Sequence, residues 1–168
     1  MQSESARAAS AAEARFRIDA PNSRGRAIKI IALDPASDGV VKRLAQTRWR
    51  GATFLTTQTS APPRGERFSM QGWLGDLAGH TKNLVDEIDS ADHVVMVATA
   101  GENAEAASII GEACSLKRVM TTALIVTPPS VSDEALSRSL TQLRPWALML
   151  VIAGAEDYIA DMLIALRA

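Results

Sequence analysis

The sequence predicts an α/β fold in which helices cover both faces of a mainly parallel β-sheet. From residue 27 onward, short β-rich runs alternate with segments of helical periodicity. This alternation is typical of βαβ units, whose consecutive strands run parallel. Residues 93–99 form a nearly continuous apolar run, as expected of a strand covered by helices on both sides.

The first half of the chain supplies two clear strands and two helices. The first strand stops at Asp34-Pro35, which is a turn signal, and Ser37 or Asp38 is the expected N-cap of the helix that follows. Residues 67–79 are ambiguous because three glycines interrupt them, although Phe68–Trp73 fits a short strand. The expected elements are strands at 27–33 and 52–57, and helices from the cap to Ala45 and from about His80 to Ala91.

The second half is more regular. Pro128-Pro129 stops a strand, Ser132 caps the next helix, and Pro145 ends it. The expected elements are strands at 93–99, 120–126 and 146–153, helices at 103–116 and 132–143, and a terminal helix with Ile159, Met162, Leu163 and Leu166 on its inner face. Together these elements predict a three-layer, Rossmann-like sandwich with a mainly parallel sheet of five or six strands.

The 168 residues suit one domain, which we place at 27–168. Residues 1–26 are rich in Ala, Ser and Arg, and we expect them to form a poorly ordered extension. They contain no apolar core of a secretory signal, and no apolar run in the chain reaches the roughly 18 residues that span a bilayer. A single cysteine excludes an intrachain disulfide and a multi-cysteine zinc site. We therefore expect a cytoplasmic protein without a membrane partner.

Charge is unevenly distributed along the chain, although the net charge is only −1. Residues 1–67 carry a net of +6, and residues 68–168 carry a net of −7. This asymmetry could orient the protein toward a partner or toward a second copy of itself. It is equally compatible with a basic extension that has no such role.

Four segments together resemble one known family. They are 27–33, 50–55, 86–101 and 140–152, and the third runs from a helix through Ala91-Asp92 into a strand that ends Thr99-Ala100-Gly101. In this order they resemble the nucleotide-binding, N-terminal half of the FtsZ/tubulin family over about residues 27–153. The resemblance implies a Rossmann-like domain with its ligand site at the carboxyl ends of the strands.

The phosphate-binding glycines of that family are largely missing. The loop after the first strand, residues 34–39, contains one glycine where the family has a glycine-rich phosphate loop. Residues 102–107 stand where the family has its glycine-rich tubulin signature. Only Ala100 and Gly101 carry over from that signature, and the family's second domain, which supplies the acid that triggers hydrolysis, has no counterpart. Acidic side chains at these helix starts stabilise the helices and repel phosphate. We therefore expect no GTPase of the FtsZ type.

Ligands of open α/β sheets bind beyond the carboxyl ends of the strands. The candidate ligand-binding residues at this edge are Asp34, Ser37, Asp38, Gly39, Thr99, Gly101, Glu102, Asn103 and Glu105. Four of them are acids, and carboxylates that converged on one crevice would suit Mg²⁺. The alternative is that each acid is a solvated helix-start residue, and the sequence assigns no metal and no cofactor.

Other candidate residues are fewer. Of the two histidines, His80 lies near an expected helix start, whereas His93 begins a strand at the opposite sheet edge. Cys114 lies among apolar neighbours in a helix and is expected in the core. The three tryptophans are expected at helix–sheet contacts. Arg43, Arg48, Arg50, Arg64 and Arg67 with Trp49 could bind an anion, but a pI near 6.1 and the lack of a nucleic-acid-binding motif disfavour nucleic acid.

The leading hypothesis is a regulatory domain that binds a small molecule or a protein partner and does not hydrolyse GTP. Two other hypotheses stay open: a Mg²⁺-dependent enzyme that uses the acidic crevice, and a self-assembling structural subunit. No catalytic residue can be assigned, because no complete catalytic motif is present in the sequence. A homo-oligomer is compatible with all three hypotheses.

Overall fold

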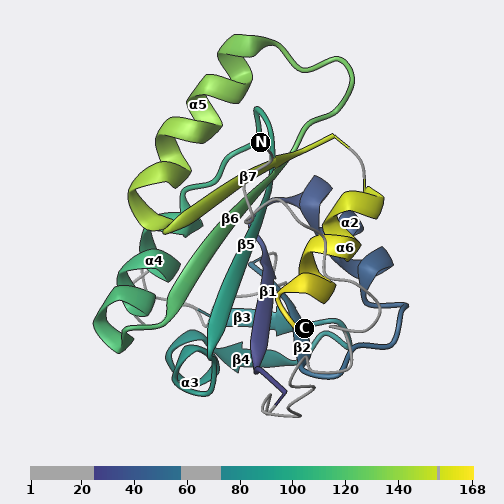
Figure 1. Cartoon of the computed structure of the whole chain (residues 1–168). Helices are drawn as coiled ribbons and strands as arrows, with labels where there is room; N and C mark the ends of the chain where they lie inside the picture. The colour runs from purple at the N-terminus through teal and green to yellow at the C-terminus, as the bar shows by residue number, and fades with distance from the viewer. Residues whose placement is uncertain (1–24, 58–72, 155) are drawn as a thin grey trace, which may run out of the picture.

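The computed structural model describes residues 25–57, 73–154 and 156–168 (Figure 1). Its strands are β1 Ile28–Ala32, β2 Ala52–Thr56, β3 Trp73–Asp76, β4 Thr81–Asn83, β5 His93–Thr99, β6 Met120–Val126 and β7 Met149–Ala153. Its helices are α2 Pro35–Leu44, α3 Leu84–Asp89, α4 Ala106–Lys117, α5 Asp133–Leu143 and α6 Glu156–Ala165, with the short 3₁₀ helix η2 at Arg144–Trp146. All but two residues of the expected extension, 1–26, and most of the segment 68–73 lie outside the described residues.

All described strands belong to one sheet, in the order β4-β3-β2-β1-β5-β6-β7. The five strands from β2 to β7 in this order are parallel, and β3 and β4 are antiparallel additions at one edge. The expectation of a mainly parallel sheet is confirmed, but the expected number of five or six strands was wrong, because the described part of the sheet already has seven. Strand β4 could not be predicted from the hydrophobic pattern, because its three residues are polar and the strand is defined by its backbone pairing with β3.

Helices cover both faces of the sheet, which gives three layers (Figure 1). Alternate residues of β5 point to opposite faces: Val94 and Met96 pack with residues of α3, α4 and α5, whereas Val95 and Val97 pack with residues of α2 and α6. Every residue of β5 is buried, which explains its continuous apolar sequence. None of the helices in the described ranges is long and apolar enough to cross a bilayer.

The start of α2 differs from the expectation. Its N-cap is Asp34 rather than Ser37 or Asp38, and Pro35 occupies the first turn. The Asp34 carboxylate accepts a hydrogen bond from the Ser37 N–H, while the Ser37 hydroxyl accepts one from the Asp34 N–H. This reciprocal capping box satisfies two buried donors and moves the helix start toward β1.

Three other boundaries were also displaced. Helix α3 begins at Leu84 rather than near His80, because the Asn83 side chain caps it by accepting from the N–H groups of Val85 and Asp86. Helix α4 begins at Ala106 instead of residue 103, and η2 delays the start of β7 from residue 146 to Met149. The Ser132 cap of α5 and its end at Leu143 are confirmed.

His93 is buried at the amino end of β5, where its Nε2 lies 2.8 Å from the Thr122 hydroxyl. Its Nδ1 is buried without a hydrogen-bond partner among the described residues. Burial, with a smaller contribution from the charge of Arg26, lowers the pKa of His93. The folded protein therefore disfavours protonation of this side chain.

We expect this residue to make stability pH-dependent. Because the folded-state pKa lies below the unfolded value near 6.5, the unfolded chain takes up the proton first as the pH falls. Stability should therefore decrease from about pH 7.5 to 5.5, and His93→Gln should flatten this dependence. Urea unfolding across this range measures the effect, with His80→Gln as the control at an exposed histidine. An equal slope in wild type and His93→Gln would contradict it.

Candidate functional site

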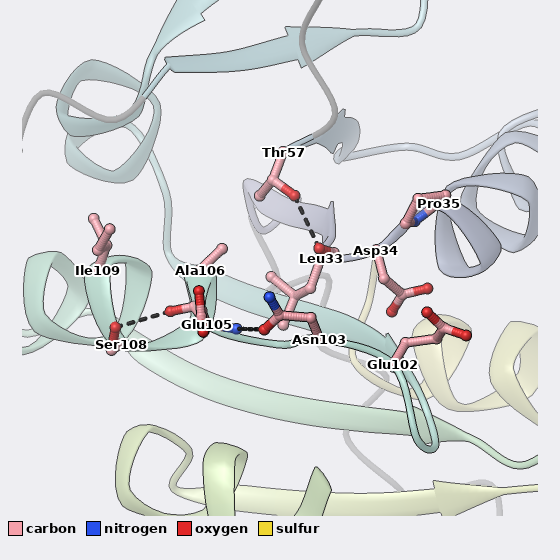
Figure 2. A pocket seen from close by; sticks show the side chains of 10 residues that line it. All are labelled: Leu33, Asp34, Pro35, Thr57, Glu102, Asn103, Glu105, Ala106, Ser108 and Ile109. Atoms are coloured by element: carbon pink, nitrogen blue, oxygen red, sulfur yellow. Dashed lines mark hydrogen bonds between the residues drawn. The ribbon is translucent and has the colours of Figure 1, made fainter. Parts of the chain in front are cut away.

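A pocket of about 680 Å³ opens at the carboxyl ends of β1 and β2, beside the start of α4 (Figure 2). Its described lining consists of Leu33, Asp34, Pro35, Thr57, Glu102, Asn103, Glu105, Ala106, Ser108 and Ile109. The β1–α2 turn supplies one wall, and the β5–α4 loop with the first turn of α4 supplies the other.

The strand order explains why a pocket forms here. After β1 the chain crosses to β2 on one side, and it later returns to β5 on the other side of β1. The connections that follow β1 and β5 leave the sheet in opposite directions, so a crevice opens between them at the carboxyl edge. Open α/β sheets bind their ligands at such a switch point. The volume is within the usual range for a small-molecule site.

Asp34 holds the two sides of the switch point together. Strand register pairs Ala32 with Val97, which brings Asp34 level with Thr99. One carboxylate oxygen accepts from the Ser37 N–H at 2.8 Å, and the other accepts from the Thr99 N–H at 2.7 Å. Since both oxygens are engaged and the residue is only 2% exposed, Asp34 fixes the shape of the pocket.

The opposite wall is anchored to α5. Gly101 adopts a φ of 91°, a left-handed conformation that favours glycine, and donates its N–H to the Ser139 hydroxyl at 2.9 Å. The Asn103 side chain accepts from the Glu105 N–H at 2.9 Å, which shapes the turn before α4. Glu105 is the N-cap residue of α4, but its side chain makes no capping hydrogen bond. The carboxylates of Glu102 and Glu105 are therefore presented from a fixed loop.

The lining is acidic. It contains three carboxylates and no basic side chain among the described residues. Figure 2 shows the carboxyl groups of Asp34 and Glu102 pointing toward each other across the turn. A Coulomb interaction between two unit charges about 6 Å apart is worth roughly 0.7 kcal/mol in water and 2.8 kcal/mol at an effective dielectric of 20. The described part of the lining thus disfavours anions and favours uncharged or cationic groups.

The structure divides the nine candidate residues into two groups. Asp34, Glu102, Asn103 and Glu105 line the pocket. The other five are not part of its lining: Ser37 is buried under the cap of α2, Asp38 pairs with Lys42, Gly39 lies beside Arg43, and Thr99 and Gly101 engage Asp34 and Ser139 through their N–H groups.

Sequence reasoning missed three residues on the first turn of α4: Ala106, Ser108 and Ile109. The available signal was helical spacing, because Ala106 and Ile109 lie three residues apart and Ile109 follows the N-cap residue Glu105 by four.

The expected crevice of four acids is not formed. Asp38 points its carboxylate to Lys42 at 2.6 Å, and both oxygens of Asp34 already accept backbone hydrogen bonds. Within residues 25–57, 73–154 and 156–168, no three His, Cys, Asp or Glu side chains are grouped closely enough to hold a metal ion. The four acids therefore do not converge on one crevice in the described structure.

The other candidates lie away from this pocket. His80 is on the β3–β4 turn, where its side chain is 74% exposed and lies 3.1 Å from Asp76. Cys114 is a buried core residue, as expected, and burial raises the pKa of its thiol to about 12, which keeps it neutral. Arg43 forms an ion pair with Glu156 on α6. Arg64 and Arg67 of the basic segment lie outside the described residues.

Two of the three tryptophans pack as expected. The Trp49 indole donates to the Leu44 carbonyl and lies 6.0 Å from the Phe54 ring, and Trp146 packs against Gly111 of α4. The side chain of Trp73 lies outside the described part of the structure. These contacts place Trp49 and Trp146 where helix ends pack against neighbouring elements, and neither lines the pocket.

Comparison with known proteins adds no assignment: no protein-family model matches the chain, and no curated protein matches it either.

Proposed function

We propose that this chain is a small-ligand-binding domain of Rossmann-like type, and that the pocket at the β1/β5 switch point is its binding site. The observation that carries the proposal is the combination of a pocket of about 680 Å³ at this edge with three carboxylates and no basic side chain in its described lining. Its ligand is uncharged or cationic on the side that faces Glu102 and Glu105.

The same observation argues against nucleoside triphosphates. Phosphate sites at helix starts rely on glycines that admit the backbone close to the phosphates and on the positive end of the helix dipole. Here Glu102 and Glu105 precede α4, and Asp34 caps α2. Each carboxylate that lies about 6 Å from a negatively charged phosphate would oppose phosphate binding by about 1–3 kcal/mol. On this proposal the chain shares the architecture of the FtsZ/tubulin nucleotide-binding half but does not bind nucleoside triphosphates.

We expect no GTP binding by calorimetry at about 100 μM protein, with or without Mg²⁺. Replacing both glutamates by glycine should restore binding only in part, because the Asp34 carboxylate remains between the two loops. Micromolar GTP binding to the unmodified protein would contradict the proposed ligand class.

A thermal-shift screen tests the positive side of the proposal. Small cationic, uncharged and anionic compounds of matched size are compared, and we expect stabilisation by members of the first two groups only. Stabilisation by cations should disappear in Glu102→Gln/Glu105→Gln. The matched control is Asp133→Asn/Glu134→Gln, which removes the same charge from the exposed first turn of α5. Stabilisation by anions, or cation effects that both double variants share, would show that the pocket is not the site.

A further inference from the structure

The described sheet ends at β7, and this edge is apolar. No described strand lies beyond β7, which runs between α5 and α6 (Figure 1). Leu148 is 79% exposed and Ile152 is 47% exposed, and Met149 between them is also exposed. Leu148 further lines a hollow of about 330 Å³ together with Met120 and Trp146, so the apolar surface continues onto β6 and η2.

The edge also leaves backbone groups without a partner strand among the described residues. The Ala153 carbonyl accepts from the Thr127 N–H at 2.9 Å, so this residue directs its polar groups toward β6. Because backbone direction alternates along a strand, Leu150 and Ile152 direct theirs away from β6. A row of outward N–H and C=O groups beside exposed apolar side chains is a template for strand addition.

The two sheet edges differ in how they are protected. Strand β4 at the opposite edge has only three residues and carries an exposed lysine, Lys82. A short edge strand and a lysine on the edge are both common ways to prevent pairing with another chain. Residues 147–154 around β7 contain no charged residue and no proline. Of the two edges in the described sheet, β7 alone lacks these protections.

We infer that β7 pairs in antiparallel fashion with β7 of a second copy of this chain, forming a two-fold dimer with a continuous sheet. An uncharged edge strand is complementary to itself, because no like charges meet when it pairs across a two-fold axis. The pairing brings Leu148 close to Ile152 of the partner subunit and removes both from solvent.

Charge around the strand specifies the antiparallel direction. Two exposed arginines lie near the amino end of β7. Arg118 lines the same hollow as Leu148, and Arg144 is the first residue of η2. Asp133 and Glu134 are exposed in the first turn of α5, whose following turns contact Gly101 at the carboxyl edge of the sheet. A two-fold axis across β7 therefore sets the basic end of one copy against the acidic end of the other. Parallel pairing would bring like charges together.

Sedimentation equilibrium of the full chain tests the dimer. We expect a species of twice 17.9 kDa at micromolar concentration. Leu148→Lys and Ile152→Lys should each raise the dissociation constant at least about tenfold, because each lysine faces an apolar partner. The matched control is Leu77→Lys, at a leucine that is 42% exposed on the β3–β4 turn. Circular dichroism verifies that every variant is folded.

A charge pair tests the direction of pairing. Leu148→Lys/Ile152→Glu places opposite charges near each other twice in an antiparallel dimer and should recover most of the lost affinity. Leu148→Lys/Ile152→Lys should not recover it. A monomeric wild type, a dimer that Leu148→Lys does not weaken, or equal behaviour of the two double variants would overturn the inference.

Discussion

Replacing Asp34 by alanine is expected to lower the free energy of unfolding by about 3 kcal/mol. The change removes the N-cap of α2, which costs about 1 kcal/mol. It also leaves the Thr99 N–H without its acceptor at a position where both residues are buried, which costs about 1–3 kcal/mol. For a chain of this length the melting temperature should fall by roughly 6–12 °C.

The matched comparison for this change is Asp38→Ala. Asp38 lies one turn into the same helix, but its carboxylate, 14% exposed, pairs only with the exposed Lys42 in an i,i+4 pair, and its Oδ1 has no hydrogen-bond partner among the described residues. This exchange should cost at most about 1 kcal/mol. Asp34→Asn should be intermediate, because the amide oxygen can accept only one of the two hydrogen bonds and the amide N–H group meets another donor. Equal losses for Asp34→Ala and Asp38→Ala in thermal unfolding would contradict the structural role of Asp34.

The strands that sequence reasoning located well share one physical property. Strands β1, β5 and β6 are almost wholly buried and mostly apolar, so their composition distinguishes them from helices and turns. Two of the boundaries that were wrong, the starts of α2 and α3, depend on side-chain hydrogen bonds. Asn83 begins α3 by accepting from two N–H groups, and no hydrophobic pattern reports this.

The site could be predicted as a place but only partly as a set of residues. The carboxyl edge follows from the βαβ order, and Glu102, Asn103 and Glu105 line the pocket at this edge. That they bind a ligand stays a prediction. Which side chains line the pocket depends on where each helix begins. Since Asp34 itself caps α2, Ser37 is drawn under the cap, and Asp38 turns toward Lys42.

Substituting Gly111 by alanine is expected to destabilise the protein, although alanine is the better helix former. A Cβ at this buried position of α4 would lie 2.5 Å from the Trp146 Cβ and 3.0 Å from two ring atoms of that indole. Such overpacking costs about 1–3 kcal/mol, which exceeds the roughly 0.5–1 kcal/mol gained from helix propensity. The conflict involves atoms close to the η2 backbone, so the tryptophan cannot simply rotate away.

Gly39 provides the opposite case in α2. A Cβ there would meet only the end of the Arg43 side chain at 3.5 Å, an ordinary contact. Gly39→Ala should therefore stabilise the protein by about 0.5–1 kcal/mol, and thermal unfolding of the two variants should shift in opposite directions. A double-mutant cycle identifies the cause: Trp146→Gly should cost less in the Gly111→Ala background than in wild type, because it removes both the Cβ and the ring atoms that clash. If the two changes add independently, the destabilisation does not come from this contact, and the close approach of α4 to η2 is not what requires glycine at residue 111.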